Sequence, residues 1–429
     1  MTIQLPPGPV SGVVSAIPSK SAAHRLLLCA ALGQGETVLV CEKESQDIAA
    51  TVRCLTALGA NITRRDGGYH VVPLDRAALR QDKTPRLLDC GESGSTLRFL
   101  LPVVCALGVT GSFQLAGRLA QRPMEPLSTQ LRQHGCVITP HPEENRLDFS
   151  GSLTPGAFTL PGNVSSQFIS GLLFALPLLS EESHLTVTGP TESVGYLHLT
   201  LQALARFSVH PTPTETGWTI APTPYRGEAT VTVEGDWSNA APWLCMGVLG
   251  GTGLTVTGLD PDSLQGDKGI CRVLQTLGGQ ITQTGTACTA TPGTPPTETE
   301  RVIDARDIPD LVPVLSAVAA VTPGTTRITG AARLRIKESD RLTTTRETLN
   351  ALGGTVTETE DGLVIHGNPH LTGGTVDAQG DHRIAMLAAV ASVVSQTEIT
   401  LTGAQAIQKS YPGFWEEVGR MKGCALVSS

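Results

Sequence analysis

The segment RIKESDR, residues 335–341, combines the residue types needed to bind an anion and to move protons. It contains Arg335, Lys337, Glu338, Asp340 and Arg341, although only 16% of the chain is charged. Lysine and arginine bind anions through charge-assisted hydrogen bonds, and a carboxyl group flanked by cations can serve in acid–base catalysis. The segment is therefore either a solvated helix start, in which Glu338 pairs with a neighbouring arginine, or part of a catalytic site.

Similar polar groups recur just before several apolar segments. The N-terminus of a helix exposes free N–H groups that favour anions. Helix capping or solvation explains each group taken singly. Neither explains why such groups recur at so many helix starts. The groups are Lys20, Ser21 and Arg25 in PSKSAAHR, Gly94 and Arg98 in CGESGSTLR, Ser165, Ser166 and Gln167 in NVSSQF, Asp381, His382 and Arg383 in GDHRIAM, Arg122 in QRPME and Lys409 in IQKSYP.

The elements that position these groups belong to an internal repeat. A helical leucine pattern followed by a β-type pair, with a glycine between them in five of the copies, recurs six times in 429 residues, as in TRETLNALGGTV (345–356). The pattern predicts a helix closed by glycine and followed by two strands. A second, more apolar helix recurs between these copies, as in HRIAMLAAVASVV, and is expected to be buried. Units of about 72 residues are too long for an ordinary solenoid, so they should group as three plus three.

The bulk composition limits the function classes. The length favours two large domains, and the net charge of −8 argues against a general nucleic-acid binder. We expect no secretory signal at the N-terminus and no membrane span. The ten cysteines form no metal-binding pattern, so we expect reduced thiols, a cytoplasmic protein and no metal.

Eight segments, in this order along the chain, resemble the motifs of the 5-enolpyruvylshikimate-3-phosphate (EPSP) synthase family. They are IPSKSAAHR, CGESGSTLRFLLP, QRPME, NVSSQFISGLL, IPDLVPVLSAVAA, RIKESDR, GDHRIAM and QKSYPGF. The resemblance implies an α/β fold, a two-domain inside-out α/β barrel with three βαβαββ units in each domain. Domain I would comprise residues 1–18 plus 238–429 and domain II residues 19–237. The resemblance also implies a double hinge near 18–20 and 235–238, with the active site in the interdomain cleft.

The resemblance further implies transfer of the enolpyruvyl group of phosphoenolpyruvate to the 5-hydroxyl of shikimate 3-phosphate. Asp310, Glu338 and Lys20 would be catalytic, with Glu338 moving the proton at the methylene carbon. The implied phosphoenolpyruvate ligands are Lys20, Gly94, Arg122, Gln167, Arg341, Arg383 and Lys409. The implied shikimate 3-phosphate ligands are Lys20, Ser21, Arg25, Ser165, Ser166, Gln167, Ser193, Asp310 and Lys337.

Two residues depart from the family pattern, because Glu92 and Arg333 stand where many members have asparagine. Two other functions stay open. A UDP-N-acetylglucosamine enolpyruvyl transferase usually carries a cysteine before its RP dipeptide, and residues 115–123 contain none. A non-catalytic anion-binding protein would have no use for Asp310 and Glu338 beside its ligand. We expect a monomer that acts on the two small-molecule substrates, binds neither nucleic acid nor membrane, and needs no cofactor.

Overall fold

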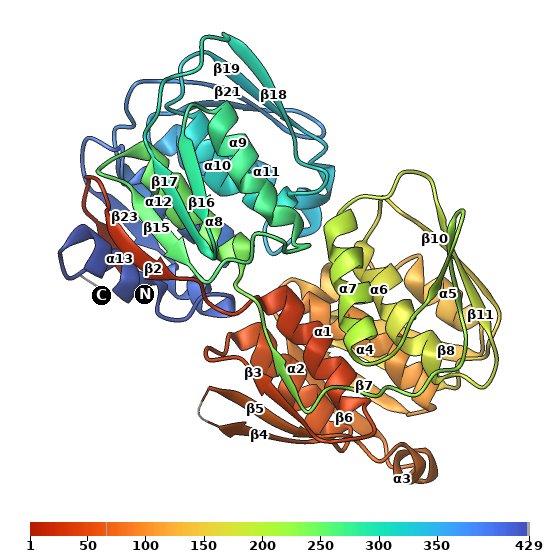
Figure 1. Ribbon diagram of the computed structural model, residues 1–429. Helices are drawn as coiled ribbons and strands as arrows, with labels where there is room; N and C mark the ends of the chain where they lie inside the picture. The colour runs from red at the N-terminus through yellow and green to blue at the C-terminus, as the bar shows by residue number, and fades with distance from the viewer. Residues whose placement is uncertain (66, 427–429) are drawn as a thin grey trace. The chain divides into compact units, whose positions relative to one another are not determined.

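The computed structural model describes residues 1–65 and 67–426, and the chain divides into two compact units. Unit 1 comprises Met1–Ser19 and Glu234–Ser429, and unit 2 is the continuous segment Lys20–Val233 (Figure 1). Residues 19 and 234–237, which the family resemblance assigned to domain II, fall in unit 1. They lie in unit 1 because Asp236 N donates to Ile17 O at 2.8 Å and Ser19 N donates to Glu234 O at 2.7 Å. Trp237 is also buried in the core of unit 1.

Unit 2 contains three four-stranded sheets within its described residues, and all have the same pairing. Two strands pair in parallel, and an antiparallel hairpin completes each sheet. The sheet orders are β14-β3-β5-β4, β6-β7-β9-β8 and β10-β11-β13-β12. The strands are β3 (Thr37–Val40), β4 (Asn61–Arg65), β5 (Gly68–Val72), β6 (Arg86–Gly91), β7 (Gly111–Leu115), β8 (Cys136–His141), β9 (Arg146–Gly151), β10 (Ala157–Pro161), β11 (Ser183–Thr188), β12 (Thr212–Thr214), β13 (Gly217–Ile220) and β14 (Thr230–Thr232).

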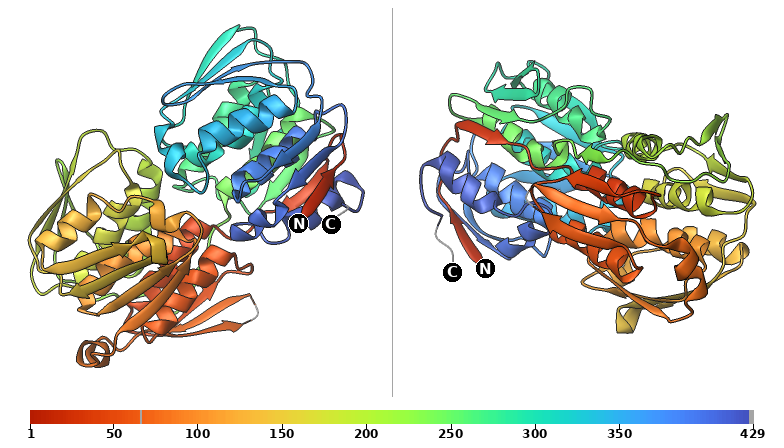
Figure 2. Two further views of the ribbon diagram at one scale, coloured as in Figure 1. Left: turned by 180° about the vertical axis from the view of Figure 1, so that it is seen from behind. Right: turned by 60° about the horizontal axis from the view of Figure 1, so that its bottom comes forward.

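Unit 1 repeats this arrangement, and the N-terminal strands complete two of its sheets. The sheet orders are β16-β17-β15-β2, β18-β19-β21-β20 and β1-β23-β22. The red N-terminal strand lies beside blue C-terminal elements in Figures 1 and 2. The strands are β1 (Thr2–Leu5), β2 (Gly12–Ser15), β15 (Leu254–Thr257), β16 (Gln280–Thr284), β17 (Ala287–Thr291), β18 (Glu300–Asp304), β19 (Thr325–Thr329), β20 (Thr355–Glu358), β21 (Leu363–His366), β22 (Gly374–Asp377) and β23 (Ile399–Thr402).

The helices follow the two recurring patterns in the sequence. Unit 2 contains α1 (Lys20–Ala31), α2 (Gln46–Ala57), α3 (Arg76–Gln81), α4 (Gly94–Leu107), α5 (Leu127–Gln133), α6 (Ser166–Ala175) and α7 (Val194–Arg206). Unit 1 contains α8 (Trp237–Leu249), α9 (Ile270–Thr276), α10 (Val312–Ala319), α11 (Arg341–Ala351), α12 (His382–Ala391) and α13 (Phe414–Lys422). None of these helices, taken over the described residues, is long and apolar enough to cross a membrane.

The helices predicted to be buried are buried. Every residue of α10 and α12 is buried, and so is nearly every residue of α4 and α6. These helices are apolar on all sides because neighbouring helices and sheets cover them. The mixed α/β fold with repeated units is therefore confirmed, and the starts of α4, α6 and α12 carry polar residues singled out above.

Two copies of the repeat differ from the prediction. Residues 423–426, which follow α13, form no strand in the described chain, and β1 pairs with β23 in place of a returning hairpin. After α7 there is no glycine at the helix end, and Ser208 adopts the left-handed conformation there, with φ of 59°. Its side chain helps to hold this turn, because Ser208 Oγ donates to Arg226 O at 3.1 Å.

Candidate active site

The polar groups of unit 1 meet around the starts of α11 and α12. We define the unit 1 cluster as Asp310, Lys337, Glu338, Arg341, Asp381, Arg383 and Lys409. Asp381 caps α12, because its Oδ1 accepts from Arg383 N at 2.9 Å. The same carboxylate is fully buried and accepts from Arg341 Nε at 2.8 Å through Oδ2. The cap therefore joins the two helix starts.

Arg341 connects three carboxylates, although its side chain is only 1% exposed. Besides the Asp381 contacts, Nη1 donates to Asp310 Oδ1 at 2.9 Å and Nη2 donates to Glu338 Oε2 at 2.8 Å. A buried guanidinium ion requires such partners because its desolvation is costly. Burial by itself would lower the pKa of Arg341, but the surrounding carboxylates raise it above its usual value. Arg341 therefore stays charged.

Glu338 and Asp310 each contact a lysine as well. Lys409 Nζ lies 3.3 Å from Glu338 Oε1, and Lys337 Nζ lies 3.4 Å from Asp310 Oδ1. Burial would raise the pKa of the Asp310 carboxyl. Lys337, Arg341 and Arg383 outweigh this effect, so the pKa of that carboxyl lies well below its usual range. Asp310 is therefore ionised at neutral pH.

Arg383 is held by α8. Its Nη1 donates to Ser238 O at 3.0 Å and its Nη2 donates to Ser238 Oγ at 2.6 Å. Its Nη2 also lies 3.5 Å from Asp310 Oδ2. Ser238 was not among the predicted site residues, because residues 235–238 were assigned to the hinge. The repeated polar start of a buried helix was a signal that could have found it.

The predicted residues of unit 2 lie at the starts of α1, α4, α6 and α7, except Arg122, which follows the short helical turn Leu119–Gln121. Lys20 begins α1, and its Nζ contacts Asp47 Oδ2 at 3.0 Å. Arg25 lies one turn further along. Its Nη1 donates to Ser21 O at 2.6 Å and its Nε donates to Thr200 Oγ1 at 2.8 Å, which ties α1 to α7. Burial lowers the pKa of Arg25 to about 10.

Gln167 connects the first turn of α6 to that of α4. Its Oε1 accepts from Arg98 Nη1 at 2.7 Å, and its Nε2 donates to Ser95 Oγ at 2.9 Å. Gly94 lies against two arginine side chains. A Cβ atom added there would meet Arg122 Nη1 at 3.0 Å and Arg98 Nη1 at 3.3 Å. Even a methyl group at position 94 would therefore require the end of the Arg122 side chain to shift. Gly94, Arg122 and Gln167 are thus close to one another.

The predicted serines also lie at helix starts. Ser165 is the N-cap residue of α6 and Ser166 its first residue. Ser193 precedes α7 in the left-handed conformation, with φ of 56°, and is buried. The structure thus places the sequence-predicted residues in two sets, one in each unit.

A buried hydroxyl network supports the starts of α1 and α4. His24 Nδ1 lies 2.6 Å from Thr51 Oγ1, which lies 2.7 Å from Thr96 Oγ1. Thr96 Oγ1 in turn donates to Ser93 Oγ at 2.7 Å. Burial lowers the pKa of His24 to about 3, so this imidazole is neutral at physiological pH.

The two residues that depart from the family pattern lie against Gly117 and Arg306. Glu92 is exposed, and its carboxylate lies against Gly117, where an added Cβ atom would be 1.8 Å from Oε1. Arg333 Nη2 donates to Arg306 O at 2.8 Å. Gly117, whose φ is 53°, provides the space that the Glu92 side chain occupies.

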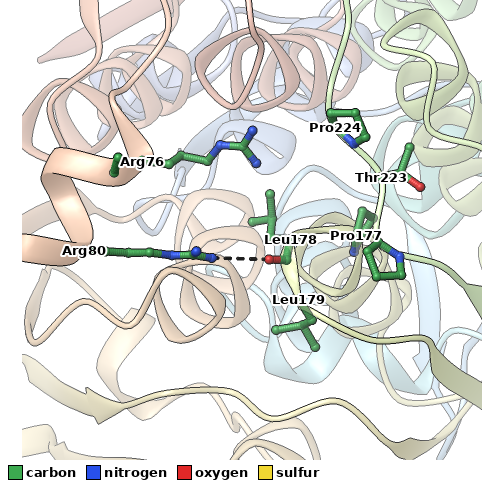
Figure 3. A pocket seen from close by; sticks show the side chains of 9 residues that line it. Arg76, Arg80, Pro177, Leu178, Leu179, Thr223 and Pro224 are labelled. Atoms are coloured by element: carbon green, nitrogen blue, oxygen red, sulfur yellow. Dashed lines mark hydrogen bonds between the residues drawn. The ribbon is translucent and has the colours of Figure 1, made fainter.

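The described residues contain no group of three or more His, Cys, Asp or Glu side chains that could hold a metal ion. A cavity of 420 Å³ in unit 2 lies between α3 and the segments around Leu178 and Thr223 (Figure 3). Arg80 Nη2 donates to Leu178 O across it, at 3.5 Å. None of the predicted site residues lines this cavity.

Comparisons with known proteins give the family. The model of the family "EPSP synthase (3-phosphoshikimate 1-carboxyvinyltransferase)" matches residues 5–418. The chain belongs to the EPSP synthase family. A 3-phosphoshikimate 1-carboxyvinyltransferase from Clostridium kluyveri is 38% identical over 422 residues, which cover 98% of this chain and 97% of the relative. One from Clostridium acetobutylicum is 38% identical over 426 residues, with the same coverage.

Solved structures show the same fold. EPSP synthase from Acinetobacter baumannii has a TM-score of 0.80 at 24% identity, covering 100% of this chain and 99% of that chain. The enolpyruvyl transferase NikO from Streptomyces tendae has a TM-score of 0.75 at 18% identity, covering 99% and 98%. The fold expected from the family resemblance is thus supported over the whole chain.

Proposed function

We infer that this chain is a 3-phosphoshikimate 1-carboxyvinyltransferase of aromatic amino acid biosynthesis. It transfers the enolpyruvyl group of phosphoenolpyruvate to the 5-hydroxyl of shikimate 3-phosphate and releases phosphate. The observation that carries this conclusion is the family match over residues 5–418, together with 38% identity to enzymes of that name over almost the full chain. Both substrates are anions, which agrees with the arginines and lysines at the helix starts.

The unit 1 cluster supports a division of roles. We assign Arg341, Arg383 and Lys409 to phosphoenolpyruvate. The cluster has four cations and three carboxylates, so it holds one excess positive charge before any ligand binds. When a substrate anion binds, the cations would pair with the anion in place of the carboxylates. Buried cations are therefore paired both with and without substrate, which avoids the cost of an unpaired buried charge.

This change of ion-pair partners would also affect the two carboxylates proposed to be catalytic, Asp310 and Glu338. The cations hold the pKa of Asp310 well below its usual range, so in the free protein it is a weak base. When substrate anions neutralise those cations, the pKa of Asp310 rises, and the carboxylate becomes a better acceptor for the proton of the 5-hydroxyl. Glu338, between Arg341 and Lys409, is assigned to proton transfer at the methylene carbon.

The predicted residues of unit 2 would complete the binding of both substrates. We assign Ser21, Arg25, Ser165, Ser166 and Ser193 to shikimate 3-phosphate, for which Asp310 and Lys337 are the unit 1 ligands. The remaining residues, Lys20, Gly94, Arg122 and Gln167, are assigned to phosphoenolpyruvate, and Lys20 and Gln167 also to shikimate 3-phosphate. Hydroxyl and amide donors suit sugar hydroxyls and phosphate oxygens. We further propose that the protein acts as a monomer in the cytoplasm, in keeping with its ten free cysteines.

One assay tests the function and its main alternative. Phosphate release from phosphoenolpyruvate is measured with shikimate 3-phosphate as acceptor, and then with UDP-N-acetylglucosamine. We expect phosphate release when shikimate 3-phosphate is the acceptor and none when UDP-N-acetylglucosamine is the acceptor. Release only with the nucleotide sugar would identify the related transferase, and binding of both anions without release would identify an anion-binding protein.

A further inference from the structure

Two pairs of thiols lie at the same sulfur–sulfur distance in the two units. Cys271 Sγ and Cys288 Sγ are 3.9 Å apart in unit 1, and Cys54 Sγ and Cys90 Sγ are 3.9 Å apart in unit 2. All four are free cysteines. The bond in a disulfide is about 2.05 Å long, so either pair could form one only if side-chain rotation brought the sulfurs about 2 Å closer.

The two pairs differ in their access to solvent. Cys271 lies in the first turn of α9 and is partly exposed, whereas Cys288 in β17 is fully buried. Cys54 and Cys90 are both fully buried, and Cys54 Sγ also donates to Asp89 O at 3.3 Å. Cys271 is therefore the more accessible member of the first pair, whereas both members of the second pair are buried.

The chemistry of the first pair is also asymmetric. A hydrogen bond from Cys288 lowers the pKa of Cys271, and that same bond together with burial raises the pKa of Cys288. The thiolate is the nucleophile in thiol–disulfide exchange, so Cys271, which is also the more exposed of the two, would be the attacking sulfur and Cys288 the resolving one.

We propose that Cys271 and Cys288 form a thiol–disulfide modification site for low-molecular-weight disulfides. The Cys271 thiolate attacks a sulfur of the small disulfide, which breaks that S–S bond and expels one small thiolate. Cys288 then loses its proton and attacks Cys271 Sγ in the mixed disulfide, which expels the second small thiolate. Two protein thiols are oxidised to one disulfide, and one small disulfide is reduced to two thiols.

The disulfide would join α9 to the sheet β16-β17-β15-β2. β17 pairs with both β15 and β16, so the bond would link α9 to the middle of this sheet. Closing the chain between residues 271 and 288 restricts the unfolded state, and we expect the melting temperature of unit 1 to rise by about 6–12 °C. Both cysteines lie outside the unit 1 cluster, so the transferase activity should not change.

The test treats the full chain with oxidised glutathione, alkylates the remaining thiols after unfolding, and maps the cysteine peptides by mass spectrometry. We expect a cross-linked Cys271–Cys288 peptide lacking two hydrogens, while Cys54 and Cys90 remain alkylated as free thiols. Cys424, which is exposed, should carry glutathione and serves as the internal control for the reagent. Unmodified Cys271 beside modified Cys424 would overturn the proposal, and so would cross-linking of Cys54 to Cys90 at an equal rate.

Two variants separate the attacking and resolving roles. Cys288→Ser should accumulate glutathione on Cys271, because no resolving thiol remains, and Cys271→Ser should leave Cys288 reduced. Neither variant should show the rise in melting temperature on oxidation. Stable glutathione on Cys271 in the wild-type chain would contradict the resolving step. The peptide map of the wild-type chain decides the proposal if either variant fails to fold.

Discussion

Glu338 contacts two cations that the family resemblance assigns to phosphoenolpyruvate, Arg341 at 2.8 Å and Lys409 at 3.3 Å. Glu338→Gln keeps the shape and most hydrogen bonds of this residue but removes its titrating group. We expect kcat to fall by about 10²–10⁴-fold, the usual contribution of a general acid–base. Binding of shikimate 3-phosphate, measured by calorimetry, should change no more than a few-fold.

A matched control for Glu338→Gln is Glu347→Gln in α11, because Glu347 is half-exposed and pairs only with Arg346 among its described contacts. This control should keep a normal kcat. A normal kcat in Glu338→Gln would instead make Glu338 a structural partner of Arg341 and leave the proton transfers to other groups.

Ser238 positions Arg383 through two hydrogen bonds, one of them from Nη2 to its Oγ at 2.6 Å. Ser238→Ala removes the Oγ acceptor and leaves the carbonyl. A hydrogen bond to a charged group contributes about 1.5–3 kcal/mol, so the KM for phosphoenolpyruvate should rise by about 10- to 100-fold. The KM for shikimate 3-phosphate should stay within about twofold, and steady-state kinetics with each substrate varied measures both.

Ser238→Thr restores the hydroxyl and should recover most of the wild-type KM for phosphoenolpyruvate. Equal increases in the two KM values, or no recovery with threonine, would show that Ser238 supports the fold of α8 rather than the orientation of Arg383.

At the scale of elements, α1 is attached to α2 and α4 by a buried polar network that contains a neutral histidine. Burial lowers the pKa of His24 from 6.5 to about 3. Between these values the unfolded chain binds a proton that the folded chain does not. The contribution of His24 to stability is therefore complete above about pH 6.5 and is lost as the pH falls toward 3.

The expected loss from His24 at pH 4 is about 3 kcal/mol in the free energy of unfolding, at 1.36 kcal/mol for each pKa unit. His24→Gln removes the titration, so the variant should lose less stability than the wild type between pH 7 and pH 4. Urea unfolding at the two pH values measures this difference. His184→Gln, at an exposed histidine of β11, should follow the wild type. An identical pH dependence in His24→Gln would contradict a neutral buried imidazole.

At the scale of the whole molecule, the two units differ in how the chain builds them. Unit 2 is one continuous segment with its own core, whereas unit 1 needs strands from both ends of the sequence. A segment that contains a complete core can fold alone. Residues 20–233 expressed alone should therefore unfold cooperatively in urea and show no phosphate release.

Residues 234–429 expressed alone lack β1 and β2, the partners of β23 and β15. This fragment should not unfold cooperatively until a peptide of residues 1–19 is added, as circular dichroism can measure. Cooperative unfolding without the peptide would show that the N-terminal strands are dispensable for the core of unit 1.

Local patterns in the sequence determined most of the elements and the candidate site residues. The helical leucine spacing, the terminal glycines and the apolar helices predicted the repeated α/β units, because these signals depend on neighbours within a few residues. The motifs that identified the family, such as RIKESDR and GDHRIAM, also lie within short segments.

Only the tertiary structure decided which distant segments meet. The pairing of β1 with β23 and the contact of Ser238 with Arg383, 145 residues apart, depend on the packing of whole helices and sheets. The same packing makes Arg341 bind three carboxylates, whereas its sequence neighbours alone suggested a pair with Glu338. A charged side chain removed from water must find partners wherever the fold supplies them, and no local pattern encodes which they are.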